Sequence, residues 1–318
     1  MGDSPAVSVV MTAYNVGAYI GAAIDSALAQ TFRDFELIVM DDGSTDGTLR
    51  VAERFTDRRI RVQRSAHRGA ATQLRDGIEQ TNGRYIALLD GDDLWSPNKL
   101  ERHVQFLDTQ PIADLSFSWS RTIDEEGRDT GITSRMWNGP ISLPELLAEN
   151  VIGNSSALVF RRSALMAAGG IDPAFEACYD LDAWLRIGAL RPGNMWALPE
   201  FLTFHRKRPG QMTADVPVME QSFEQLLQKA RWFAPRAAAL VERRARSNMR
   251  RFCASGWYRA GYYGQALWTM IRSLSGAPRV FFADGRNWEM MSASLSAVFL
   301  PAALHRRFVR DAVKSPSA

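Results

Sequence analysis

The sequence has little cysteine and no long hydrophobic run. It contains two cysteines in 318 residues, Cys178 and Cys253, so a disulfide framework is disfavoured, although a single bridge stays open. The uncharged stretch 290–304 would span only about 22 Å as a helix, which is too short for a hydrocarbon core of about 30 Å. No basic segment followed by an apolar run opens the chain, so no signal peptide is expected. These absences favour a cytoplasmic location.

Two common nucleotide-binding signatures are also missing. No G-x-G-x-x-G opens the first predicted helix and no Walker A sequence is present, which disfavours a dinucleotide fold and a P-loop. Residues 42–53 do match the spacing of a calcium-binding EF-hand loop. An EF-hand loop follows a helix, however, whereas residues 36–40 are typical of a strand. We therefore predict a tight turn that caps the following helix.

The first hundred residues alternate between strand and helix patterns. Such an alternation predicts an α/β protein with a mostly parallel central sheet flanked by helices. Ser96 and Pro97 are typical of the N-cap and first position of the helix that follows the last of these strands. From about Val218 the pattern is helical, with breaks at three prolines. The predicted strands are 7–11, 35–40, 60–62 and 85–89, and the predicted helix-forming residues between them lie near 20–28, 49–55 and 74–78.

Acidic residues follow two of the predicted strands. Asp41 and Asp42 end one strand, and the segment Asp90-Gly91-Asp92-Asp93 ends another. Parallel strands present their carboxyl ends at one edge of a sheet, so the two groups can converge on one ligand. A few carboxylates in an open shell suit Mg²⁺ or Mn²⁺ when a substrate diphosphate supplies further oxygens. A solvated turn is the alternative for the second segment alone.

A third acidic pair, Asp180 and Asp182, lies near a predicted helix start. One interpretation is favourable interaction with the helix dipole. The other is a general base, because transfer to a hydroxyl requires a group that accepts its proton.

Four ordered motifs together resemble the family 2 inverting glycosyltransferases of GT-A fold. The resemblance covers roughly residues 6–213. It rests on four segments: VSVVMTAYN (7–15), QTFRDFELIVMDDGSTD (30–46), GRYIALLDGDDLW (83–95) and YDLDAWLR (179–186).

The resemblance implies roles for matching residues in an enzyme that uses a nucleotide diphosphate sugar. Asp180 would be the catalytic base, and Asp92 would hold a divalent metal, Mn²⁺ or Mg²⁺. The residues implied to bind the nucleotide sugar are Thr12, Tyr14, Asp42, Asp90, Asp92 and Asp93. Further candidates are Asp41, Asn15, Arg75, Asp182, Trp184, His205 and Arg208.

The sequence departs from the family pattern at two places. Tyr179 stands where the family usually has Glu, and Arg208 aligns with a position that often holds His. A shift of the alignment would instead place His205 there. If Arg208 holds this position, its side chain would contact the diphosphate as a permanently charged cation. The segment Asn154-Ser155-Ser156 lies where the family forms part of its acceptor side, although small polar residues before a strand are also typical of a turn.

Charge divides the chain unevenly. Residues 221–318 carry 16 Lys and Arg against 5 Asp and Glu, so the first 220 residues carry a net charge of −8 within a total of +3. We expect a catalytic domain at 1–217 and a basic helical extension at 218–318 that serves as a membrane-surface or dimerisation element. Arg306, Arg307 and Arg310 beside an apolar helix suit anionic lipid. No nucleic-acid-binding module accompanies the charge.

The sequence therefore predicts transfer of a sugar, favoured to come from a UDP-sugar, to a hydroxyl of a glycan or lipid-linked glycan. The expected location is cytoplasmic, with peripheral attachment to the inner face of the membrane as a hypothesis. The alternative is a non-catalytic membrane-associated protein of the same fold that binds nucleotide sugar or glycan. The donor sugar, the acceptor and the oligomeric state are not predicted.

Overall fold

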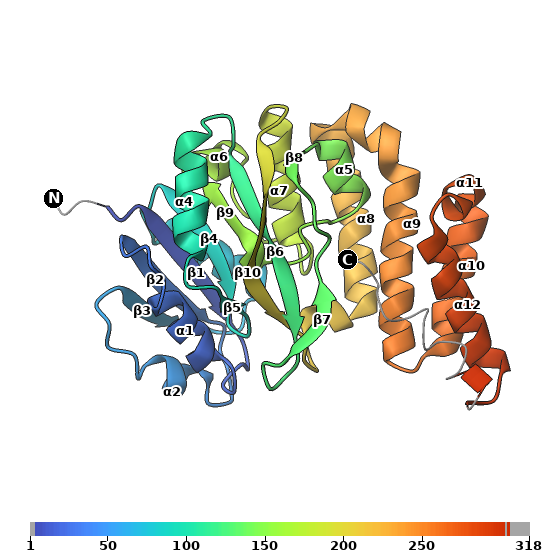
Figure 1. Ribbon diagram of the computed structural model, residues 1–318, viewed down its shortest axis with the longest axis horizontal. Coiled ribbons are helices and arrows are strands. Elements are labelled where there is room, and N and C mark those ends of the chain that lie inside the picture. Colours follow the sequence, from blue (N-terminus) through green and yellow to red (C-terminus); the bar gives the residue numbers. More distant parts are fainter. Residues whose placement is uncertain (1–3, 303, 306–318) are drawn as a thin grey trace. The chain divides into compact units, whose positions relative to one another are not determined.

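The computed structural model describes residues 4–302 and 304–305 (Figure 1), and these form two compact units. The first unit comprises the chain up to Ser142 together with Val151–Arg208. The second comprises Leu143–Asn150 and the residues from Pro209 onward. Each unit has its own core and is described separately.

The first unit is built on a ten-stranded sheet with the order β3-β2-β1-β4-β9-β6-β10-β5, in which β7 pairs with β6 and β8 with β10. Strands β3, β2, β1 and β4 are parallel, which confirms the prediction for the first hundred residues. Strand β9 is antiparallel to both β4 and β6, so the sheet as a whole is mixed. The strands are β1 (Val7–Ala13), β2 (Phe35–Asp41), β3 (Ile60–Arg64), β4 (Tyr85–Asp90), β5 (Leu94–Trp95), β6 (Leu115–Ile123), β7 (Asp129–Thr133), β8 (Gly139–Ile141), β9 (Leu158–Arg161) and β10 (Met195–Arg206).

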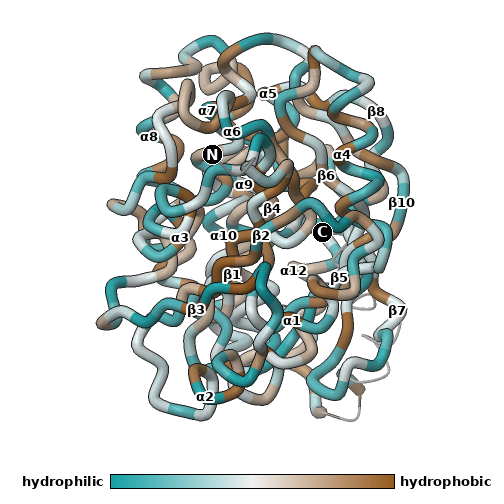
Figure 2. Tube along the Cα trace, turned by 90° about the vertical axis from the view of Figure 1, so that its left-hand side faces the viewer, coloured by the Kyte–Doolittle hydropathy of each residue, from teal (hydrophilic) through white to brown (hydrophobic). Residues whose placement is uncertain are grey.

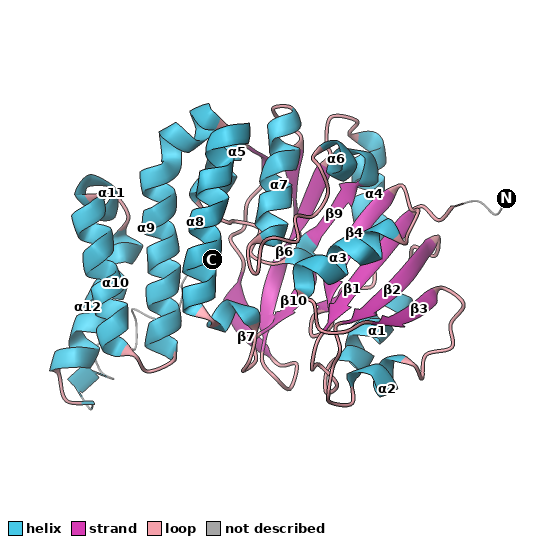
Figure 3. Cartoon of the chain, turned by 180° about the vertical axis from the view of Figure 1, so that it is seen from behind, coloured by secondary structure: helices cyan, strands magenta, loops and turns pink. Residues whose placement is uncertain are grey.

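Helices cover both faces of this sheet (Figures 1 and 3). Alternate residues of the apolar strand β1, which is coloured as hydrophobic in Figure 2, face opposite sides. Val9 and Met11 pack with α1 and α4, whereas Val10 faces α3, where the absence of a side chain at Gly77 allows close contact. The helices of this unit are α1 (Ile20–Leu28), α2 (Thr48–Ala52), α3 (Ala70–Glu79), α4 (Lys99–Thr109), α6 (Arg162–Ala167) and α7 (Tyr179–Leu190), with the 3₁₀ turn η1 (Ser155–Ala157).

The predicted start of α4 is wrong by two residues. The helix begins at Lys99 with Asn98 at the N-cap, not at Pro97 with Ser96 as the cap. The reason is tertiary: β5 pairs with β10, and the N–H of Ser96 continues this pairing by donating to the carbonyl of Leu202. The sequence pattern contains no sign of this two-residue strand.

The second unit is helical, as predicted. Pro235 and Pro278 occupy the first turns of α9 and α11, where the missing N–H costs nothing. Within the described residues no helix has the length and apolar character needed to cross a membrane. Arg306, Arg307 and Arg310 of the predicted lipid-binding segment lie outside the described residues. The helices are α5 (Leu143–Ala148), α8 (Val216–Phe233), α9 (Pro235–Arg259), α10 (Tyr263–Gly276), α11 (Pro278–Phe282) and α12 (Gly285–Phe299), with the 3₁₀ turn η2 (Met212–Ala214).

A buried lysine connects α4 to the centre of the sheet. The Lys99 amino group is fully buried and contacts the Ala157 carbonyl at 3.0 Å, Thr203 Oγ1 at 3.2 Å and His103 Nε2 at 3.3 Å. These partners are neutral oxygens and an imidazole, so burial lowers the pKa of Lys99 well below its usual value. Lys99 thereby ties α4 to η1 and β10.

This burial predicts an unusual dependence of stability on pH. Because the folded-state pKa of Lys99 is depressed, the unfolded chain binds more protons between that pKa and the ordinary value of about 10.4, and stability rises with pH across this window. Lys99→Met removes the titrating group. We expect the Tm of wild type to rise relative to that of Lys99→Met as the pH is raised from about 7 to about 9.5, with a limiting slope of about 1.4 kcal/mol per pH unit inside this window, which amounts to several degrees. Parallel Tm curves for the two proteins would contradict a neutral buried amine.

Candidate active site

The carboxyl ends of β1, β2 and β4 bring the predicted residues to one edge of the sheet. In the strand register, Ala13 is level with Asp41, and Thr12 is level with Asp90. The Thr12 hydroxyl donates to Asp90 Oδ1 at 3.5 Å. The two acidic strand ends therefore lie at the same edge of the sheet, on either side of β1.

The chain turns sharply after Asp90. The N–H of Gly91 donates to the Thr12 carbonyl, and a Cβ at Gly91 would lie 3.1 Å from Val16 and 3.2 Å from that carbonyl. Glycine thus allows the acidic segment to lie directly against β1. The residues that follow, Asp92 and Asp93, are both buried.

Asp180 joins this cluster from the start of α7. Its carboxylate accepts hydrogen bonds from the Ser155 hydroxyl at 2.8 Å and the Leu181 N–H at 2.7 Å. The hydroxyl of the adjacent Ser156 accepts from the N–H of Asp90 at 3.0 Å. Two consecutive serines therefore bridge the end of β4 and the start of α7. The sequence analysis named this segment but did not assign it the bridging role, which depends on a contact between residues far apart in the chain.

The electrostatics follow from burial and from the close approach of like charges. The pKa of Asp90 is raised well above its usual value by burial and by the charges of Asp93, Asp92 and Asp180. Burial also raises the pKa of Asp180, and the hydrogen bond from Ser155 partly opposes this shift. Within the described residues neither Asp90 nor Asp180 has a cationic partner. The cluster therefore has an excess of negative charge.

The end of β10 and the residues after it supply partners to the other two carboxylates. Arg208 Nε lies 2.7 Å from Asp92 Oδ2, and His205 Nδ1 lies 3.2 Å from Asp93 Oδ1. Burial raises the pKa of Asp93, but the charge of His205 and the hydrogen bonds that Asp93 receives outweigh it, so this pKa is lowered. Both residues that the sequence analysis weighed, His205 and Arg208, thus contact the acidic segment. Arg206, which it did not name, donates to the Asp92 carbonyl.

The negative charge of this site suits a divalent cation, but the described side chains alone do not form a complete set of metal ligands. No group of three His, Cys, Asp or Glu side chains arranged to hold a metal occurs in the described part of the chain. Mg²⁺ is commonly held by one or two carboxylates together with substrate phosphates. The unbalanced carboxylates around Asp90 have the hard oxygen ligands and the negative charge for such a shared site.

The other side of the site contains Tyr14, Asn15 and Asp42. Asp42 is buried, and it accepts hydrogen bonds from the N–H groups of Arg68 and Gly69 and from the Gln73 side chain. Asn15 has φ of +49° and accepts from the Thr45 N–H, which fixes the loop that carries the exposed Tyr14. Asp41 is buried and accepts from the Ser44 N–H.

Strained backbone occurs next to two of the candidate site residues, Tyr14 and Asp180. In the described part of the chain the non-glycine residues with positive φ are Asn15 and Cys178, at +49° and +59°. Asn15 follows Tyr14, and Cys178 immediately precedes Tyr179 and Asp180. Strained non-glycine residues persist where surrounding structure fixes them, and they concentrate at functional sites.

Three candidates have contacts of a structural kind. Asp182 is fully buried and pairs with Arg186 at 2.6 Å, and Arg186 also donates to the carbonyls of Ala168 and Gly170. Trp184 is buried in the core. Arg75 pairs with its neighbour Asp76 on α3. These contacts are all made outside the carboxylate cluster.

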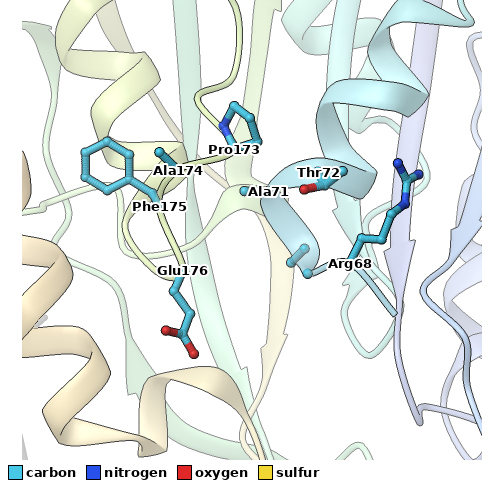
Figure 4. Close-up of a pocket in the computed structure, with 9 residues that line it drawn as sticks. Arg68, Ala71, Thr72, Pro173, Ala174, Phe175 and Glu176 are labelled. Atoms are coloured by element: carbon cyan, nitrogen blue, oxygen red, sulfur yellow. The ribbon is translucent and has the colours of Figure 1, made fainter. Parts of the chain in front are cut away.

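A pocket of about 220 Å³ lies beside the site. Arg68, in the loop before α3, and Thr72, in the first turn of α3, face the loop that precedes α7, with Pro173 and Glu176 (Figure 4). A larger pocket of about 390 Å³ lies among Arg33 and residues 57–59, which precede β2 and β3. It is therefore at the opposite edge of the sheet, away from the clustered carboxylates.

Comparison with known proteins gives a consistent result. The model of the family "Glycosyl transferase family 2" matches residues 8–168. The chain is 31% identical over 192 residues to EpsE of Bacillus subtilis (strain 168), whose name assigns it provisionally to the glycosyltransferases, covering 58% of this chain and 68% of EpsE. It is 35% identical over 130 residues to WfaP of Escherichia coli, named as a UDP-Glc:alpha-D-GlcNAc-diphosphoundecaprenol beta-1,3-glucosyltransferase, covering 40% of this chain and 51% of WfaP. The matches thus span from half to about two thirds of these relatives.

Two solved structures have a similar fold. TarS 1–349 of S. aureus, in complex with UDP-GlcNAc, aligns with a TM-score of 0.61 at 17% identity, covering 97% of this chain and 89% of TarS. The mannosyltransferase PcManGT of Pyrobaculum calidifontis, in complex with GDP-Man and Mn²⁺, aligns with a TM-score of 0.59 at 20% identity, covering 93% of this chain and 86% of that one. The α/β architecture with its central sheet is therefore the GT-A fold.

Proposed function

The chain belongs to glycosyl transferase family 2, and we propose that it transfers a sugar from a nucleotide diphosphate sugar to a hydroxyl with inversion. One observation carries the proposal: Asp180 and Asp90 meet in a single cluster, bridged by Ser155 and Ser156. The cluster thus combines a candidate base with the acidic segment suited to a diphosphate.

The proposed reaction is a single displacement. Asp180, in its ionised form, accepts the proton of the acceptor hydroxyl. The acceptor oxygen forms a bond to the anomeric carbon while the bond from that carbon to the diphosphate oxygen breaks, and the nucleoside diphosphate leaves with the electron pair. Attack on the face opposite the leaving group inverts the anomeric centre. Ser155 and the Leu181 N–H orient the carboxylate of Asp180 for this role.

Two sources of positive charge can offset the charge of the leaving diphosphate. Asp92, with Asp90 and Asp93 close by, would hold a divalent metal, which supplies Lewis acidity at the diphosphate when bound. Arg208 adds a fixed cation beside Asp92. The Mn²⁺ in the PcManGT complex supports a metal in this fold, and the choice between Mn²⁺ and Mg²⁺ remains open.

We propose a UDP-sugar donor, with the base at Tyr14 and Asp42. The UDP-GlcNAc complex of TarS and the UDP-Glc in the name of WfaP support this choice. The diphosphoundecaprenol acceptor in the name of WfaP supports a lipid-linked glycan as the acceptor. A role in polysaccharide biosynthesis in the cytoplasm would follow.

The second unit, taken by itself, suits peripheral attachment to an anionic membrane. Phe282 and Trp288 are 56% and 44% exposed, and their rings lie 5.4 Å apart. Phe299, at 72%, extends the apolar stripe of α12. Exposed aromatic rings on a unit with excess Arg are typical of helices that lie in a lipid interface.

Asp180→Asn tests the enzymatic role. The substitution keeps the size of the side chain but removes the base, so we expect turnover to fall by about 10²–10⁴-fold. Turnover is followed as release of nucleoside diphosphate from UDP-sugars. Calorimetric binding of UDP with Mn²⁺ should persist. Asp25→Asn, at an exposed position on α1, is the control and should retain full activity. A wild type that binds UDP but never turns over any donor would favour the non-catalytic alternative.

Ser155→Ala tests the environment of the base. Burial raises the pKa of Asp180 and the Ser155 hydrogen bond lowers it, so loss of that bond raises the pKa further. The base works only when ionised, and activity is lost as pH falls through its pKa. We therefore expect the acid limb of the kcat/KM profile to move to higher pH in Ser155→Ala, and to stay in place in Ser292→Ala, which lies in the second unit. A uniform loss of kcat/KM at every pH would contradict this account of Ser155.

Membrane attachment can be tested with vesicles. We expect the full chain to sediment with phosphatidylglycerol vesicles at low salt. With phosphatidylcholine vesicles, the protein should stay in the supernatant. Phe282→Ser/Trp288→Ser should weaken the binding about tenfold, because the rings no longer enter the interface. Circular dichroism confirms that the variant is folded. Binding that is unchanged in this variant would contradict the proposed surface.

A further inference from the structure

Of the acceptor positions on the Asp42 carboxylate, one is covered only by an exposed side chain and could be taken over by a ligand. A carboxylate offers about four lone-pair positions. Three are filled by donors that the fold fixes: the N–H groups of Arg68 at 2.8 Å and Gly69 at 3.0 Å, and the buried Gln73 amide at 2.8 Å. His67 covers the fourth: its Nδ1 lies 2.7 Å from Asp42 Oδ2 and 3.2 Å from the backbone carbonyl oxygen of Asp42.

His67 is the partner of Asp42 that can leave most easily. Its side chain is 58% exposed, whereas the Gln73 side chain is buried and the other two donors are backbone groups at the start of α3. Gly43, with φ of +73°, permits the close approach of the loop that carries His67, since a Cβ at residue 43 would lie 2.9 Å from the backbone nitrogen of His67. Rotation of one exposed side chain would therefore open the fourth position without disturbing the fold.

The contacts of His67 match those expected of a nucleotide base. Its imidazole stacks on Tyr14, with ring centroids 4.3 Å apart and an interplanar angle of 22°, while Nδ1 faces Asp42. A uracil bound as proposed above would also stack on Tyr14 and donate its imide N–H to Asp42. Asp42 has no fifth position, so the imidazole and the base exclude one another.

We propose that His67 is an internal competitor of the nucleotide base and sets the affinity of the donor site. This inference rests on the proposed function. In the empty site the imidazole takes the place of the base, and nucleotide binding must break its stack on Tyr14 and its hydrogen bond to Asp42. The lost contacts are subtracted from the binding free energy of any ligand that inserts a base. They also favour release of the nucleoside diphosphate after transfer, a step that limits the rate of many enzymes.

The test compares ligands with and without a base. Calorimetry with Mn²⁺ measures binding of UDP and of inorganic pyrophosphate to wild type and to His67→Ala. We expect His67→Ala to bind UDP about tenfold more tightly, the size of one net hydrogen bond to a charged group. Pyrophosphate, which does not reach Asp42 and Tyr14, should bind both proteins equally. His67→Phe keeps a ring on Tyr14 without the hydrogen bond and should be intermediate.

Arg68→Ala is the matched control in the same loop. Its side chain pairs with Asp76, and its backbone donor to Asp42 is retained, so UDP should not bind more tightly. Weaker or unchanged UDP binding in His67→Ala would overturn the proposal and leave the transferase standing, because His67 would then support the base or not meet it. If no folded variant binds any nucleoside diphosphate, the proposed function fails and this inference fails with it.

Discussion

The concentration of buried and half-buried carboxylates at one edge of the sheet is the constraint on which the site depends. Parallel strands deliver Asp90 and its neighbours there, and α7 adds Asp180. Like charges in a buried place disfavour their own ionisation, so the arrangement is costly unless cations arrive. The chain supplies His205 and Arg208 to one side only. The remaining negative charge is available to a cationic ligand, as the proposed metal and diphosphate site requires, whereas a closed ion-pair network would leave none.

Much of the first unit could be predicted because its signals are local. Strand β1 is mostly apolar, and β2 and β4 are apolar runs that end in Asp41 and Asp90, the acids that the register brings to one edge. Residues 157–160 are predicted as a strand, in agreement with β9, but the antiparallel pairing of β9 and the two-residue β5 were not predicted, since both are decided by partners distant in sequence. The same limit applies to the site. Asp180 could be named from its motif, whereas the bridging role of Ser155 and Ser156 depends on a tertiary contact.

The two Asp residues at the start of α7 show why a motif does not assign roles by itself. Asp180 and Asp182 are two positions apart, so they lie on different sides of the helix. Asp182 is fully buried and tied to Arg186, which in turn holds the turn after α6. Asp180 faces the cluster and has no cationic partner in the described residues. Composition and spacing treat the two alike, and only the packing of α7 separates the structural residue from the candidate base.

The adjacent serines have a consequence for acceptors of different size. A single peptide unit separates the residue that holds the candidate base from the residue that holds the end of β4. The candidate base Asp180 and the end of β4 are thus linked almost as one rigid piece, so the distance between them is fixed. Variation in acceptor shape must then be absorbed by the surrounding loops. Related chains that use different acceptors would accordingly differ in those loops, while the spacing between Asp180 and the end of β4 stays constant.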